Sequence, residues 1–72
     1  MDIKKENFKR IAENRTNKII DMISLLGNLS NKSYYEYSDE QIDAIFDAIQ
    51  SELDQQRIKF QELKNNKQRF QL

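Results

Sequence analysis

The sequence has no cysteine, no histidine and no proline, and it has one glycine among its 72 residues. Without cysteine there is no disulfide, and without cysteine or histidine there is no ordinary zinc site. Few residues here interrupt a helix, which favours long helices over a β fold with many turns. A single domain this small buries only about 60% of the surface that its unfolded chain exposes. We therefore expect oligomerisation to supply part of its stability.

Long apolar runs are missing as well. Residues 1–6 contain no apolar segment of the kind found in signal peptides. The stretch from Ile19 to Leu29 is interrupted by Asp21, Ser24 and Asn28, so it is too short and too polar to cross a bilayer. We expect no membrane association, and the lack of cysteine is compatible with a cytoplasmic location.

Catalytic and cofactor motifs are also lacking. The chain offers no histidine base, no cysteine nucleophile and no glycine-rich phosphate loop, so we expect a protein that is not an enzyme and binds no cofactor. Asp39, Asp43 and Asp47 fall on one face of a helix and are the candidate metal ligands. A row of carboxylates without backbone carbonyls is a poor calcium site, so a solvated acidic face is the preferred interpretation.

The second half of the chain carries a regular apolar pattern. Between residues 42 and 70, apolar side chains recur at alternating spacings of four and three, with polar interruptions at Gln56 and Lys67. Such a heptad repeat is typical of a long helix that packs against other helices. We use the name apolar seam for Ile42, Phe46, Ile49, Leu53, Gln56, Phe60 and Leu63.

The start of this second helix is marked by Ser38 and Gln41. Their spacing predicts a capping box, and Tyr37 with Ile42 predicts a hydrophobic staple. We expect the helix to cover about residues 39–66 and to end in a frayed C-terminus.

The first half of the chain predicts a helix from about residue 3 to residue 26. Gly27 follows the last apolar position, and we expect it in the left-handed conformation that ends many helices. Arg15 stands in the middle of the apolar stripe. Either its stem packs while its charged head reaches water, or it makes a buried polar contact. The stripe consists of Phe8, Ala12, Ile19, Met22, Ile23 and Leu26.

These features predict an all-α fold in one domain over residues 1–72: an antiparallel two-helix hairpin that dimerises into a helical bundle. The loop over residues 27–38 is long for a helix–helix connection, so we expect it to fold on itself with some of its tyrosines packed on the helix ends. Each helix of a hairpin has one partner, so the remaining apolar surface must meet another copy or another protein. The predicted interface comprises the apolar seam together with Ile19, Met22 and Leu26.

A polar layer is predicted inside this arrangement. Counting back from the loop places Arg15 level with the stretch from Glu52 to Gln56. We predict that Arg15 bonds to Glu52 or Gln56 of the same chain or of a partner chain. Such a layer fixes register and partner number at some cost in stability.

Charge is distributed unevenly although the net charge is zero. Residues 4–18 hold six basic residues against two acidic ones, residues 33–56 hold seven acidic residues and no basic one, and residues 57–72 hold five basic residues against one acidic one. In an antiparallel hairpin the two basic blocks meet at the end opposite the loop. The residues of this basic end that are candidate nucleic-acid contacts are Lys5, Lys9, Arg10, Lys64 and Lys67.

A sequence signature accompanies these features. It consists of the run from Leu26 to Asn31, the run from Tyr35 to Glu40, and Ile42 with Ile45-Phe46. Over about residues 8–60 the chain resembles a group of small bacterial proteins of unassigned function, many of them carried on plasmids and other mobile elements. The resemblance implies a bacterial cytoplasmic accessory protein and brings no site residues with it.

Three functions follow from the sequence. The preferred one is protein–protein interaction, with a second copy of the chain, another protein, or both as partner. The first alternative is a nucleic-acid-binding accessory protein that uses the basic end, although the chain is not basic overall. The second alternative is an acidic inhibitor that mimics DNA and blocks a host defence nuclease.

Overall fold

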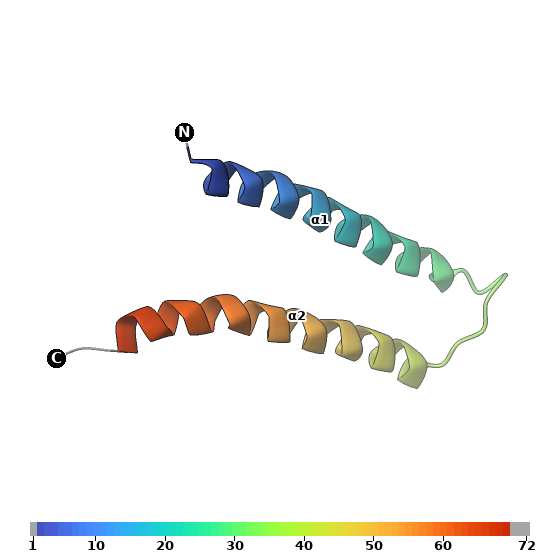
Figure 1. Ribbon diagram of the computed structural model, residues 1–72. Coiled ribbons are helices and arrows are strands. Elements are labelled where there is room, and N and C mark those ends of the chain that lie inside the picture. The colour runs from blue at the N-terminus through green and yellow to red at the C-terminus, as the bar shows by residue number, and fades with distance from the viewer. Residues whose placement is uncertain (1, 70–72) are drawn as a thin grey trace. The chain divides into compact units, whose positions relative to one another are not determined.

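The computed structural model describes residues 2–69, and the side chains of residues 2–64. Over the described residues the chain is all-helical and has no strand, which confirms the predicted fold class. The elements are helix α1 (Ile3–Gly27) and helix α2 (Asp39–Arg69), both labelled in Figure 1, with a short 3-10 helix η1 (Asn28–Ser30) directly after α1. The chain divides into two units, Met1–Glu36 and Tyr37–Leu72.

Helix α1 begins at a cap that the sequence analysis did not identify. Asp2 has extended backbone angles (φ −95°, ψ 101°), and its carboxylate accepts hydrogen bonds from the backbone N–H groups of Lys4 at 3.1 Å and Lys5 at 3.3 Å. The N–H of Glu6 donates to the carbonyl oxygen of Asp2 at 3.1 Å. The two bonds to the carboxylate satisfy amide groups of the first turn that have no partner within the helix, and the bond from Glu6 is the first of the helical ladder.

The end of α1 differs from the prediction. Gly27 is the last residue of the helix and has right-handed angles (φ −58°, ψ −30°), so the expected left-handed conformation is wrong. The physical reason is that the chain does not reverse here. It tightens into η1, and the N–H of Asn28 points to the carbonyl oxygens of Ser24, Leu25 and Leu26.

The segment between η1 and α2 is folded on itself, as expected. Asn31 organises it: its side-chain oxygen accepts from the N–H of Ser33 at 2.9 Å, and its backbone oxygen accepts from the N–H groups of Tyr34 and Tyr35, each at 3.1 Å. Tyr34 is 81% exposed, whereas Tyr37 is half-buried. Of the three tyrosines, Tyr37 is therefore the one that packs.

Helix α2 begins at the predicted capping box. The N–H of Ser38 donates to Oε1 of Gln41 at 2.9 Å, and the N–H of Gln41 donates to Oγ of Ser38 at 3.1 Å. Tyr37 and Ile42 are both half-buried, as a hydrophobic staple requires. The helix continues to Arg69, three residues beyond the expected end, and Phe70 lies outside the described residues.

Neither unit has a core of its own. Among residues 2–64, no side chain is buried. The half-buried residues of this range lie on the predicted apolar faces or at the predicted staple: Ala12, Leu26, Tyr37, Ile42 and Ile49. Both helices therefore present their apolar faces as surface that is available for packing.

Candidate interaction surface

The apolar seam forms one continuous line along α2. Phe46 and Leu53 are each 50% exposed and Phe60 is 66% exposed, while Ile42 and Ile49 are half-buried. At 1.5 Å per residue, the line from Ile42 to Leu63 is about 30 Å long. Its spacing is 3.5 residues per turn, so the line drifts slowly around a straight helix and favours a left-handed supercoil with a partner.

The polar position of the seam has a partner on its own helix. Nε2 of Gln56 donates to Oε1 of Glu52 at 3.0 Å, and elsewhere on the helix Nε2 of Gln50 donates to Oδ1 of Asp54 at 2.9 Å. Two of the three predicted members of the polar layer, Glu52 and Gln56, are thus in contact. Arg15 is an exposed residue of α1, and its bond to either of them stays a prediction.

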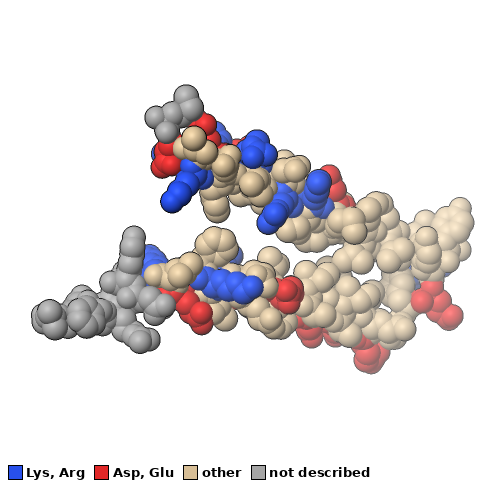
Figure 2. Space-filling model, in the orientation of Figure 1, with Lys and Arg blue, Asp and Glu red and all other residues tan. Residues whose placement is uncertain are grey.

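Charged residues flank the seam in two blocks of opposite sign. Residues 39–54 of α2 include six acidic residues and no basic one, and residues 57–69 include five basic residues and one acidic one. Figure 2 shows acidic side chains over the first part of α2 and basic side chains further along it. The spacing of these charges relative to the seam is readable from the sequence alone.

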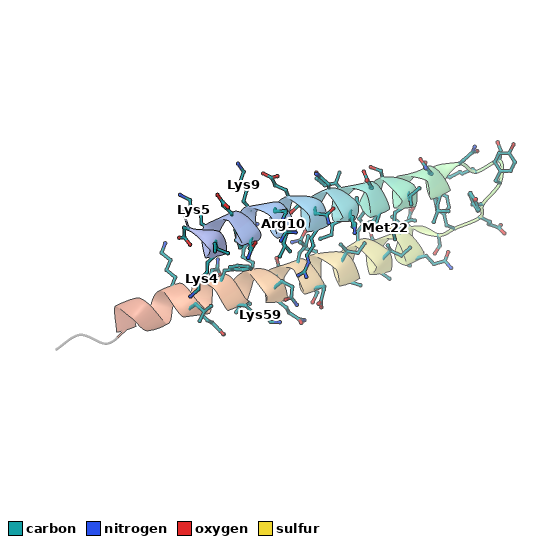
Figure 3. The ribbon with its side chains drawn as sticks, turned by 45° about the horizontal axis from the view of Figure 1, so that its top comes forward. Lys4, Lys5, Lys9, Arg10, Met22 and Lys59 are labelled. Atoms are coloured by element: carbon teal, nitrogen blue, oxygen red, sulfur yellow. The ribbon has the colours of Figure 1, made fainter. Side chains whose placement is uncertain are left out.

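On α1, the residues of the basic end are exposed but are not an isolated cationic patch. Lys5 and Lys9 project from the same side of the helix (Figure 3). Nη2 of Arg10 donates to Oδ1 of Asn7 at 3.4 Å. A shallow depression on this polar face is lined by Glu6, Lys9, Arg10, Glu13, Asn14 and Asn17. Because all of these residues come from one helix, the depression does not surround a ligand, and its two glutamates oppose binding of a phosphate.

The remaining residues of the basic end lie on α2. Lys64 is exposed, and the side chain of Lys67 lies outside the described residues. The basic end therefore takes its members from both units, and its action as one surface stays a prediction.

The described residues show neither a metal site nor a helix that could span a membrane. Asp39, Asp43 and Asp47 are exposed, and in the part of the chain that the structure describes no three histidine, cysteine or acidic residues are grouped so that they would hold a metal ion. Neither helix, over its described residues, has the length and apolar character needed to cross a membrane.

Comparison with protein-family models, with curated proteins and with solved structures gave no match. The resemblance to small bacterial proteins of mobile elements stays a prediction.

Proposed function

We propose that this chain is a non-enzymatic helical protein that acts by protein–protein interaction through the apolar seam of α2. The observation that carries the proposal is the exposure of large apolar side chains, among them Phe46, Leu53 and Phe60, along a single line of that helix. A line of this length is the surface that one helix presents to another. In the cell we place the protein in the cytoplasm of a bacterium, as an accessory or regulatory protein of a mobile element.

The energetic reason for association is the apolar surface itself. Removing apolar surface from water contributes about 25 cal/mol per Å². In water, most of the stability of a helix comes from packing of its apolar face and not from helix propensity. A partner that covers the seam therefore stabilises α2 and is held by it.

The proposed arrangement is an antiparallel hairpin that self-associates. Folding α1 back along α2 covers part of the seam with the apolar stripe of α1, which includes Ile19, Met22 and Leu26. Two hairpins then enclose the rest in a four-helix bundle, the simplest closed arrangement of this kind. Another protein that presents an apolar helix face satisfies the same requirement.

The test compares two substitutions of the same chemistry on α2. Leu53 belongs to the seam and is 50% exposed; Ile58 is 45% exposed and lies about 140° around the helix from Leu53. We expect Leu53→Gln to abolish association, measured as sedimentation of the purified protein and as capture of partners from a nuclease-treated bacterial lysate. Ile58→Gln should leave both unchanged. Equal effects of the two substitutions, or no association of the parent protein in either assay, would reject the proposal.

Nucleic-acid binding remains the second candidate. The observation that favours it is the projection of Lys5 and Lys9 from the same side of α1 (Figure 3). Basic side chains one turn apart are able to contact successive phosphates of a backbone.

A further inference from the structure

We infer that the partner on the apolar seam is a second copy of α2 that runs antiparallel, in a register centred between Leu53 and Gln56. The inference rests on the proposed function, because it uses the same seam. It is carried by the charges that flank the seam and by the position of its one polar residue.

The heptad spacing assigns the flanking residues. Phe46, Leu53 and Phe60 occupy position a of the heptad, and Ile42, Ile49, Gln56 and Leu63 occupy position d. One flank of the seam, position e, then consists of Asp43, Gln50, Arg57 and Lys64. The other flank, position g, includes Ile45, Glu52 and Lys59. All of the charged residues among them are exposed.

The orientation of the two helices follows from these charges. In a parallel pair each half of α2 lies beside the same half of the second copy, so the half with six acidic residues, 39–54, lies along the same half of the second copy. Position g also faces the e position five residues later, which sets Lys59 beside Lys64 of the second copy, a pair of like charge, and Glu52 beside Arg57, a pair of opposite charge. An antiparallel pair instead places the acidic half against the basic half. Opposite charges at positions e and g are the feature that sets orientation in paired helices.

The register follows from the same charges. In an antiparallel pair, e faces e and g faces g. The centred register sets Asp43 beside Lys64 of the second copy, and Glu52 beside Lys59 of the second copy. A shift by one heptad in one direction brings the two Glu52 residues together, and a shift in the other direction brings the two Lys59 residues together. The centred register is the one of the three without a like-charged pair, and it pairs the seam positions from Phe46 to Leu63.

The central layers of this register contain Gln56. Leu53 of each copy lies level with Gln56 of the other, so the two Gln56 residues lie on either side of the two-fold axis, about 4.5 Å apart along the helices. Each is already held by its bond to Glu52. A carboxylate accepts several hydrogen bonds, so Glu52 also retains the capacity to accept from Lys59 of the second copy. A polar residue at one core position specifies register in paired helices, and Gln56 is placed to do so.

The second copy also resolves a conflict of charge in the proposed hairpin. Folding α1 back along α2 brings Lys5 and Lys9 near the basic residues 57–64 of the same chain. The acidic half of the second copy's α2 lies against this region in the antiparallel pair. Opposite charges then offset the repulsion that a single hairpin leaves unbalanced.

The test is a charge exchange in the full chain, with the dimerisation constant measured by sedimentation equilibrium at low ionic strength. Glu52→Lys and Lys59→Glu each turn the two symmetric Glu52–Lys59 contacts of a dimer into repulsions, and each should weaken dimerisation about tenfold. An equimolar mixture of the two variants should form heterodimers with parental affinity, because all pairs in the mixed dimer are again of opposite sign. The double variant should likewise dimerise as the parent does.

Glu62→Lys is the matched control, since it makes the same change of charge at a residue of α2 outside positions e and g. This control should leave the dimerisation constant within about twofold of the parental value, because an exposed charge away from the contact contributes little to affinity. Tighter dimerisation of Lys59→Glu would show parallel pairing, in which the new carboxylate faces Lys64, and would overturn the inference. An equimolar mixture of the Glu52→Lys and Lys59→Glu variants that does not dimerise with parental affinity would also overturn the inference.

A parent protein that stays monomeric would also overturn the inference. In that case the proposed function is tested separately by capture from the bacterial lysate. It is supported if the Leu53→Gln variant no longer captures a partner that the Ile58→Gln variant still captures, and rejected otherwise.

Discussion

At the scale of single residues, Gly27 gives the most direct prediction. Its φ of −58° suits any L residue, and a Cβ built at this position meets no atom within 4 Å apart from its chain neighbours and the backbone of its own helix. Alanine is favoured over glycine in a helical conformation, chiefly because it restricts the unfolded chain. We expect Gly27→Ala to raise the free energy of unfolding by about 0.5–1 kcal/mol, as measured by chemical denaturation followed by circular dichroism. A loss of stability would instead indicate the left-handed conformation.

Gly27 also shows where reading of the sequence fails at this scale. A glycine after the last apolar residue of a helix is common at left-handed ends, and nothing in the residue itself excludes that conformation. The outcome depends on the following residues, Asn28–Ser30, which continue in a right-handed 3-10 turn. The cap at Asp2, in contrast, was predictable from the sequence. Aspartate is a preferred N-cap residue, and Asp2 directly precedes the predicted first residue of the helix.

At the scale of helices, the capping box is the feature that the sequence predicted best. Ser38 and Gln41 bond to each other's backbone N–H groups, so each satisfies an amide that has no partner within α2. We expect Ser38→Ala to cost about 1 kcal/mol of stability and to lower the helix content. Gln41→Ala should add less in the Ser38→Ala background than in the parent, because the two bonds form one unit.

Ser51→Ala is the control for the cap. Ser51 is an exposed residue inside α2, where alanine is the better helix former, so this substitution should leave stability unchanged or raise it slightly. Equal losses from Ser38→Ala and Ser51→Ala would contradict a specific capping role.

Helices were predictable here because their signals are local. The apolar period and the Ser38 cap each lie within a few residues of what they determine, and α1 and α2 begin at the expected residues. The C-terminal end of α2 was predicted three residues too early, because asparagine propensity at Asn65 and Asn66 is a weak signal that the rest of a long helix outweighs. The partner of each apolar face was not predictable in this way. Spacing identifies the face that packs and carries no information on the helix that it packs against.

At the scale of the whole molecule, the two candidate functions differ in their dependence on salt. We expect no change in fluorescence anisotropy of labelled single- or double-stranded oligonucleotides at low salt, because Glu6 and Glu13 line the same face of α1 as Lys9 and Arg10. Steep, salt-dependent binding would contradict this expectation. The slope against salt should then fall by about two when Lys9 and Arg10 are replaced by glutamine, which would establish the basic end as the contact.

The last prediction concerns the polar layer, which links both helices to the oligomer. Glu52 and Gln56 are hydrogen-bonded to each other, so a pair of polar groups lies at the middle of the seam. Burial of this pair in a bundle requires further partners, because a buried polar atom without one costs about 1–3 kcal/mol. Arg15 is the residue of the α1 stripe that is able to provide them, since its guanidinium carries five donors.

The layer predicts opposite effects for two related variants. Arg15→Leu alone should destabilise the protein by about 1–3 kcal/mol, because it leaves Glu52 and Gln56 without their donor. Adding Gln56→Leu should recover or exceed the parental stability, since apolar packing replaces a buried polar network. It should also loosen the oligomeric state, because a leucine at position 56 no longer distinguishes the centred register, in which the two Gln56 residues lie beside the two-fold axis, from shifted ones. Denaturation and sedimentation of both variants measure the two effects. If the single-substitution energies simply add and the double variant sediments as the parent does, the charged head of Arg15 reaches water and only its stem packs.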